Sequence, residues 1–382
     1  MLIKNCVLID GADIFEEKRD IRIRDGKIET VAAVLEPEAD EEVVDAGGAL
    51  VTPGFVEASG QVGIRNQIYR FEENDGDDAN PLMPEARAYD ALNFEDEGFV
   101  MAQRGGVTTV VSGPGNENLI GGTAVAVKTA GEMPDTQILV PEAAYRFVLT
   151  NEPRRKFGAK NQSPQTRLGS AAMIRDMLFK AREYGRKEKA GEKQDYKMDL
   201  AALSRVFDGM PVLMAAMKAN DMETAVRIGE EFGLNYILVM AYDAVTVLKD
   251  LQRKDFRFII GPLYGSEFSD EAAGMRLELG AELEREGVHA AISTGHPSVS
   301  LEILQTQLIL MTDRGLSRQE AIKGVTAYPA QFLGLDSRIG TLEPGKDADL
   351  VIWDGDPLQY DGRVGQMFID GKLIDIKQDA EV

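Results

Sequence analysis

Two side chains that could bind a ligand, Ser59 and Gln61, stand two residues apart after the run Pro53-Gly54-Phe55-Val56-Glu57. Residues two apart in a β-strand face the same side, so this segment would direct both side chains to one point. A hydroxyl and an amide oxygen are weak, neutral ligands that cannot neutralise a divalent cation. The pair by itself therefore does not make a metal site.

Histidine is scarce, because the 382 residues contain two, His289 and His296. A site of three or four imidazoles cannot be assembled from one copy of this sequence. Ser59 and His296 could form a nucleophile–base pair. No third group that would orient the base is evident, so we favour a small filling residue and a rim residue. His289 is expected to begin a strand at the opposite end of the fold, where it would serve stability.

Further candidates come directly after strand-like runs. Lys218 and Asp243 could bind a polar ligand or act as acid and base, although a salt bridge is the simpler expectation. Met214, Met217 and Met240 could line an apolar pocket or fill the core, since methionine adapts to irregular gaps.

A glycine-rich segment, residues 113–123, precedes Ala124-Val125-Ala126-Val127, which we expect to be helical. Its amides could hold an anion at a helix start, but it lacks the Gly-Lys-Ser/Thr ending of a phosphate loop. A structural turn is the favoured interpretation. If a pocket survives, ligand contacts are expected from a small set of polar residues, namely Asn116, Asn118, Arg154 and Arg155.

Strand-like runs alternate with helices between residues 53 and 339. The runs are 108–111, 138–140, 212–216, 236–240, 257–260 and 290–293. Asp221 can cap a helix that Gly233 closes, and Ser317 opens another helix through a capping box. These repeated units predict an α/β protein whose parallel sheet closes into a (β/α)8 TIM-like barrel. Residues 1–52 and 340–382 resemble strands and turns, so we expect one small β-sandwich module built from both termini.

The composition limits the classes of binding partner that are expected. The formal net charge is −22, with 44% hydrophobic and 28% charged residues. Nucleic acids and anionic membranes are polyanions, so neither is expected as a partner. No apolar run approaches the ~20 residues of a membrane helix. The single cysteine, Cys6, excludes an internal disulfide and fits a reducing compartment, so we expect a cytoplasmic protein.

Two segments carry a resemblance to a known family. Val51-Thr52-Pro53-Gly54-Phe55 resembles an entry into a barrel that continues as Ile-Asp-x-His-x-His-x-Gly in relatives. The tail contains Gly340-Thr341-Leu342-Glu343-Pro344-Gly345-Lys346-Asp347-Ala348-Asp349-Leu350 and resembles a return from the last barrel helix into the β module. Together they resemble the amidohydrolase superfamily, in its imidazolonepropionase-like and dihydroorotase-like branch. In that family one or two divalent metals, such as zinc, activate a water.

The resemblance implies that this chain has lost the metal ligands. The histidine pair of strand one falls on Ser59 and Gln61, and the strand-five stretch falls on Ala215-Ala216-Met217. The strand-six histidine falls on Met240 and the strand-eight aspartate on Gly295, while the strand-four ligand falls near Arg146 or Asn151. Without a metal, the pKa of water stays near 15.7, so hydroxide is scarce at neutral pH. No metal cofactor is therefore expected.

Three functions follow as hypotheses. The first is a non-catalytic structural or regulatory partner of a catalytically intact homologue, in a homo- or hetero-oligomer. The second is an active hydrolase of cyclic amides or other non-peptide C–N bonds, with an atypical site that uses Asp243, Lys218 or His296. The third is a protein that binds a small molecule in a methionine-lined pocket.

Overall fold

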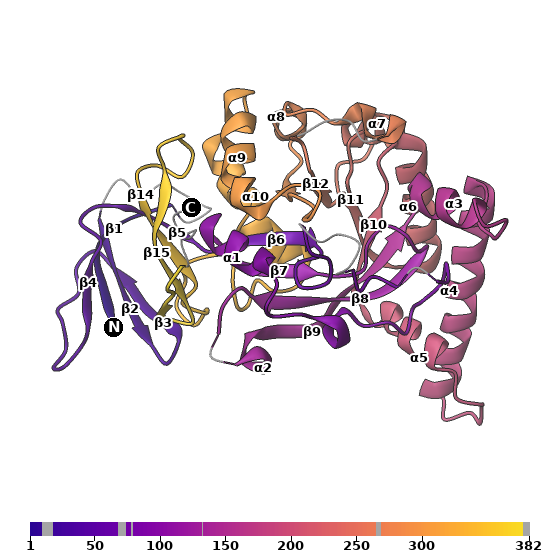
Figure 1. Cartoon of the computed structure of the whole chain (residues 1–382), viewed down its shortest axis with the longest axis horizontal. Helices are drawn as coiled ribbons and strands as arrows, with labels where there is room; N and C mark the ends of the chain where they lie inside the picture. The colour runs from indigo at the N-terminus through magenta and orange to yellow at the C-terminus, as the bar shows by residue number, and fades with distance from the viewer. Residues whose placement is uncertain (10–17, 68–73, 78, 132, 265–268, 377–382) are drawn as a thin grey trace.

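The computed structural model of the chain describes residues 1–9, 18–67, 74–77, 79–131, 133–264 and 269–376. These residues form a small β module, at the left of Figure 1, and a larger barrel with helices around it. The barrel and the additional sheet built from both ends of the chain are confirmed. None of the helices in the described part of the chain combines the length and the apolar character that a bilayer crossing requires.

Eight strands follow one another around the barrel sheet in chain order. They are β6 (Phe55–Gly60), β7 (Val107–Ser112), β8 (Ile120–Lys128), β9 (Ile138–Val148), β10 (Pro211–Ala215), β11 (Asn235–Val239), β12 (Phe258–Ile260) and β13 (Ala290–Ile292). Seven of these run in the same direction, whereas β8 is antiparallel to both of its neighbours. The sheet is therefore not parallel throughout.

The antiparallel strand β8 corrects one expectation from the sequence. Ala124 to Val127 were expected to be helical, but they lie in β8 and pair with β7 and β9. Every residue of β8 is buried, and its sequence from Ala124 to Val127 shows no alternation of polar and apolar side chains. A strand that is buried on both faces loses the alternation that would distinguish it from a buried helix.

Helices surround the barrel, with the long α4 at the right of Figure 1. The α-helices are α1 (Glu97–Arg104), α2 (Pro134–Gln137), α3 (Asn151–Gly158), α4 (Arg167–Lys189), α5 (Met198–Ser204), α6 (Ala219–Phe232), α7 (Ala244–Leu251), α8 (Leu279–Arg285), α9 (Leu304–Asp313), α10 (Arg318–Gly324) and α11 (Ala327–Phe332). Short 3₁₀ helices are η1 (Ala88–Ala91), η2 (Arg205–Asp208), η3 (Asp270–Gly274) and η4 (Leu301–Ile303).

The helix ends test the predicted caps. Ser317 caps α10 by accepting the amide of Glu320, and Gly233 ends α6 in the left-handed conformation, so both predictions are confirmed. Asp221 was expected to cap α6, but the cap residue is Lys218. The Asp221 carboxylate lies in the first turn instead and accepts a hydrogen bond from Arg167 at 2.7 Å.

The barrel closes between β6 and β13 through Glu57. Its buried carboxyl group accepts hydrogen bonds from the backbone amide of Thr294 at 2.9 Å, from the Thr294 hydroxyl at 3.0 Å, and from the Ser293 hydroxyl. The amide of Gln61 also donates to the carbonyl of His296 at 2.9 Å. No ladder pair joins β6 to β13 among the described residues, so these side-chain and loop contacts hold the two strands together.

The small module combines residues from both ends of the chain. Its strands are β1 (Leu2–Leu8), β2 (Arg19–Arg24), β3 (Lys27–Ala32), β4 (Val43–Asp45), β5 (Leu50–Pro53), β14 (Leu350–Asp354), β15 (Arg363–Ile369) and β16 (Lys372–Leu373). They follow one hydrogen-bonded path in the order β16-β15-β14-β5-β1-β2-β3, and β4 pairs with β1. Apolar side chains from both ends, including Ile3, Val51 and Phe368, form its core.

An aromatic contact joins the module to the barrel. Trp353 of β14 packs against Phe55 of β6 with ring centroids 5.3 Å apart, and its indole nitrogen donates to Thr52 Oγ1 at 2.9 Å. A Cβ on Gly106 would lie 2.7 Å from the Trp353 ring, and Gly106 has a φ of +79°. Glycine is therefore required at this approach.

A cluster of charges forms a second link. Lys128, the last residue of β8, is buried, and its Nζ lies 2.7 Å from Asp347 Oδ2 and 3.2 Å from Asp349 Oδ1. It also pairs with Asp370, and Arg338 pairs with Asp347 at 2.7 Å. A lysine of the barrel is thus neutralised by aspartates that precede and follow the strands of the module.

This cluster predicts a pH-dependent stability. Burial raises the pKa of Asp349 from 3.8 to about 6, and attraction to Lys128 offsets only part of this effect. The folded protein keeps this proton at pH values where the unfolded chain has lost it, so stability falls as the pH rises from 3.8 to about 6. Asp349→Asn lacks this titration. The unfolding free energy of the variant minus that of wild type should therefore rise by up to about 3 kcal/mol between about pH 4 and pH 7.

Urea unfolding followed by Trp353 fluorescence would measure this difference at each pH. Asp354→Asn, at the exposed end of β14, serves as the control and should show no such change. Equal pH dependence of the two variants would contradict the role of Asp349.

Candidate functional site

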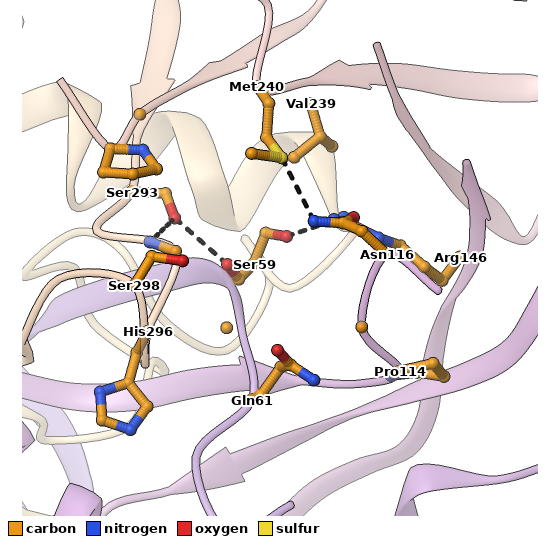
Figure 2. A pocket seen from close by; sticks show the side chains of 15 residues that line it. Ser59, Gln61, Pro114, Asn116, Arg146, Val239, Met240, Ser293, His296 and Ser298 are labelled. Atoms are coloured by element: carbon orange, nitrogen blue, oxygen red, sulfur yellow. Dashed lines mark hydrogen bonds between the residues drawn. The ribbon is translucent and has the colours of Figure 1, made fainter. Parts of the chain in front are cut away.

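Two adjoining cavities open at the carboxyl ends of the barrel strands. The inner chamber has a volume of about 40 Å³ and is lined from several elements, among its residues Ser59, Gln61, Asn116, Arg146, Met240 and His296 (Figure 2). The outer cleft has a volume of about 500 Å³ and shares part of this lining, namely Gln61, Asn116, Met240 and Ser298. Ligands of α/β barrels bind at this end of the strands, so these cavities are the candidate site.

Arg146 of β9 supplies the charge of the inner chamber. Its Nη1 donates to Ser59 Oγ at 3.0 Å and its Nη2 donates to Asn116 Oδ1 at 2.5 Å (Figure 2). Its Nε is buried and makes no hydrogen bond to any of the described residues. Burial lowers the pKa of Arg146 to about 10, and the carboxylate of Glu117 opposes this change. The guanidinium therefore stays positive at neutral pH, with neutral acceptors on both of its bonded nitrogens.

Asn116 and Met240 complete the wall beside Arg146. The Asn116 amide nitrogen contacts Met240 Sδ at 3.5 Å, while its oxygen accepts from Arg146, so the amide orientation is defined. Met240 follows β11 with a φ of +57°, a left-handed conformation that is rare for a residue with a long side chain. Such backbone strain clusters at functional sites.

His296 and Ser59 do not form a nucleophile–base pair. His296 is buried, with 1% of its surface exposed, and not on the rim as expected. Figure 2 shows its ring directed away from Ser59, whose hydroxyl accepts the bond from Arg146. A Cβ on Gly98 would lie 3.1 Å from His296 Nε2, so the imidazole packs against the start of α1. His289 lies at the amino end of β13, is exposed, and pairs with Glu320 at 2.8 Å.

The positions aligned with the family's metal ligands mostly reach the cavities. Ser59, Gln61, Met240 and Gly295 line the inner chamber, and Met217 lines the outer cleft. Ala215 is fully buried at the end of β10 and lines neither. Across the described ranges, no group of three or more His, Cys, Asp and Glu residues could hold a metal ion. A hydroxyl, two amides and a thioether beside a guanidinium do not fit a divalent cation.

Other predicted contacts belong to the surrounding structure. Asn118 donates to the carbonyl of Asn80 at 2.6 Å, and Arg154 pairs with Glu271 at 3.3 Å. Neither is among the described residues that line the two cavities. Arg155 lines the outer cleft and pairs with Glu152.

Lys218 and Asp243 are engaged in structural contacts as well. Lys218 pairs with Asp270 at 2.8 Å. The Asp243 carboxylate accepts the amide of Ala219, the first residue of α6, at 3.1 Å. Of the three methionines expected to line a pocket or fill the core, Met214 is fully buried in the core, whereas Met217 and Met240 line the cavities beside polar residues.

Two functional positions were not among the sequence candidates. Glu57 was quoted only as part of a motif, and Arg146 only as a possible strand-four position. Each is a charged residue within a buried stretch of its strand, and the exposed fractions are 0% for Glu57 and 7% for Arg146. A lone charge in an apolar run is the signal that could have found both, because a buried charge needs a structural or functional reason.

Known proteins match both the fold and the sequence. A solved amidohydrolase from Thermotoga maritima superimposes with a TM-score of 0.93 and is 31% identical, over 98% of this chain and 99% of that one. Amidohydrolase tasK of Hapsidospora irregularis is 25% identical over 378 residues, and this match spans 90% of the chain but 38% of tasK. The imidazolonepropionase of Sphingopyxis alaskensis is 40% identical over 90 residues, 22% of each protein.

The family assignment rests on these matches. The amidohydrolase family model matches residues 268–377, which include the tail motif noted above. With 31% identity to the Thermotoga maritima protein over nearly all of both chains, this chain belongs to the amidohydrolase family.

Proposed function

We propose that this protein is a non-catalytic member of its family, in which metal-dependent hydrolysis has been lost and the barrel serves as a structural or regulatory partner of a metal-bearing homologue. The observation that carries the proposal is the buried guanidinium of Arg146 on Ser59, a residue aligned with the first metal ligand of the family. A permanent positive charge there opposes the binding of a metal ion.

The size of this effect supports the proposal. Ser59 Oγ lies 3.0 Å from Arg146 Nη1. A metal ion bound to Ser59 Oγ at about 2.1 Å would therefore lie within about 5 Å of Arg146 Nη1. At an effective dielectric constant of about 20, a divalent ion and a guanidinium repel each other by about 7 kcal/mol at that distance. Neutral ligands such as Gln61 and Asn116 offer no charge to offset this repulsion.

The role of a partner also fits the preserved scaffold. The barrel, its caps and its junction with the β module are intact, so the loss concerns the site rather than the fold. A barrel without a hydrolytic metal can still occupy a subunit position in an oligomer with an intact homologue, and the same fold supports unrelated roles.

Metal analysis of untagged protein tests the proposal. After expression in medium supplied with zinc, iron and manganese, we expect far less than one bound metal per chain. We also expect no hydrolysis of cyclic amides above the buffer rate, because no group would lower the pKa of water. Stoichiometric metal, removed by a chelator together with hydrolytic activity, would contradict the proposal and favour an atypical hydrolase.

The partner role needs a separate measurement. A metal-bearing homologue from the same host should co-elute with this chain in size-exclusion chromatography when both are purified and mixed. The complex should also change the activity or the stability of the homologue. Independent elution of the two proteins would contradict this part of the proposal.

A further inference from the structure

Among the described residues that line the inner chamber, Arg146 carries the one formal charge and none is a carboxylate. Within the described residues, no carboxylate lies at ion-pair distance from this guanidinium, which is 7% exposed. Charges that are almost completely buried are normally paired, because an uncompensated buried charge is costly. The chamber therefore lacks the negative group that its arginine requires.

We propose that the inner chamber binds the carboxylate of a small organic acid, with Arg146 as its counter-charge. This inference rests on the metal-independent function proposed above. It goes beyond that function by assigning the chemical class of a ligand.

The other polar groups of the chamber are suited to an anion. Arg146 has five N–H donors, and the structure uses two nitrogens for Ser59 and Asn116 while Nε stays unbonded. Ser59 accepts from Arg146, which leaves its own hydroxyl hydrogen for a ligand. The side-chain amide of Gln61 lines both cavities and can donate two further hydrogen bonds. A guanidinium with further hydrogen-bond donors beside it favours a ligand that is negatively charged and accepts hydrogen bonds.

The volumes favour a carboxylate on a larger molecule. The inner chamber of about 40 Å³ has room for about three water molecules, which is the size of a carboxylate group. It shares four lining residues with the outer cleft of about 500 Å³, a volume that suits the remainder of a small molecule. One guanidinium neutralises one negative charge, so a monoanion fits better than a phosphate dianion.

The charges of the outer cleft do not prevent this occupancy. Its carboxylates are paired within the protein, Glu117 with Arg65 at 3.3 Å and Glu152 with Arg155. Glu271 pairs with Arg154. Arg146 is therefore the charge in these two cavities that a ligand would neutralise.

Calorimetric titration of the full-length protein tests the proposal. The probes are benzoate and N-acetylglycine, their neutral amides benzamide and N-acetylglycinamide, and inorganic phosphate. We expect the carboxylates to bind and raise the melting temperature, whereas the amides do not. Arg146→Gln should weaken carboxylate binding by about 10- to 100-fold, the usual value of a charge-assisted contact. Arg146→Lys should retain part of the affinity.

Arg257→Gln provides a matched control. Arg257 is half-buried and, like Arg146, bonds to neutral partners, Asn235 Oδ1 at 2.6 Å and the Tyr236 carbonyl at 2.8 Å, but it lies at the amino end of β12. It should leave carboxylate binding unchanged. Absence of binding to wild type, equal binding to Arg146→Gln, or equal binding of acids and amides would overturn the proposal. Metal content is measured separately, so bound metal would contradict the proposed function without deciding the carboxylate result.

Discussion

Replacement of Glu57 by alanine should lower the free energy of unfolding by about 3–5 kcal/mol. The variant would leave the amide and the hydroxyl of Thr294 without their acceptor, at the point where β6 meets β13. The Ser293 hydroxyl would lose Glu57 and keep the Ser59 carbonyl at 3.2 Å. Each unsatisfied buried group costs about 1–3 kcal/mol, and the lost side chain adds a cavity. Urea unfolding at neutral pH would measure the effect, and a loss below about 1 kcal/mol would contradict this role of Glu57.

Glu57→Gln is the matched control, because glutamine keeps the shape and one acceptor. Burial raises the pKa of Glu57, against the hydrogen bonds from Ser293 and Thr294. Wild type therefore loses stability as the pH rises above the unfolded value of 4.5, whereas the glutamine variant does not. The cost of Glu57→Gln should accordingly shrink with rising pH. A cost that grows with pH would contradict the raised pKa.

Replacement of Lys128 by methionine should destabilise the protein by about 3–5 kcal/mol, since removal of one partner leaves a buried charge uncompensated. The Lys128 side chain is 2% exposed and pairs with Asp347, Asp349 and Asp370. Asp347 keeps Arg338 and Lys27 as partners, so the buried carboxylate that loses its cation is that of Asp349. Unfolding should begin at the junction of module and barrel. Hydrogen exchange of β8 and β14 would then rise together.

Lys27→Met tests whether the destabilisation by Lys128→Met comes from the loss of a buried ion pair or from the change in net charge. Lys27 also pairs with Asp347, but its side chain is 41% exposed, so its loss should cost no more than about 1 kcal/mol. Equal destabilisation by the two substitutions would show that net charge, rather than the buried contact of Lys128, determines the stability of the junction.

Strand periodicity predicted part of the inner chamber, but not the contact that gives the chamber its charge. Ser59 and Gln61 were expected to face one point because they lie two apart in a strand, and both line the chamber. The guanidinium that meets Ser59 comes from Arg146, 87 positions later in the chain. That contact depends on the order and register of β6 to β9, which local patterns do not contain. The chemical character of the site, a cation that has no carboxylate partner in the described part of the chain, therefore could not be derived from the β6 motif.

The sequence by itself determined the family, the barrel and the contribution of both termini to one module, because these depend on repeated local patterns and a distinctive tail. It also determined helix ends such as Ser317 and Gly233, where one residue supplies the hydrogen bond or the left-handed conformation. Only the tertiary structure decided that β8 is a strand, that His296 is buried and that Arg146 occupies the chamber. Burial on both faces removes the periodic signal, and contacts between distant strands are set by register rather than by neighbouring residues.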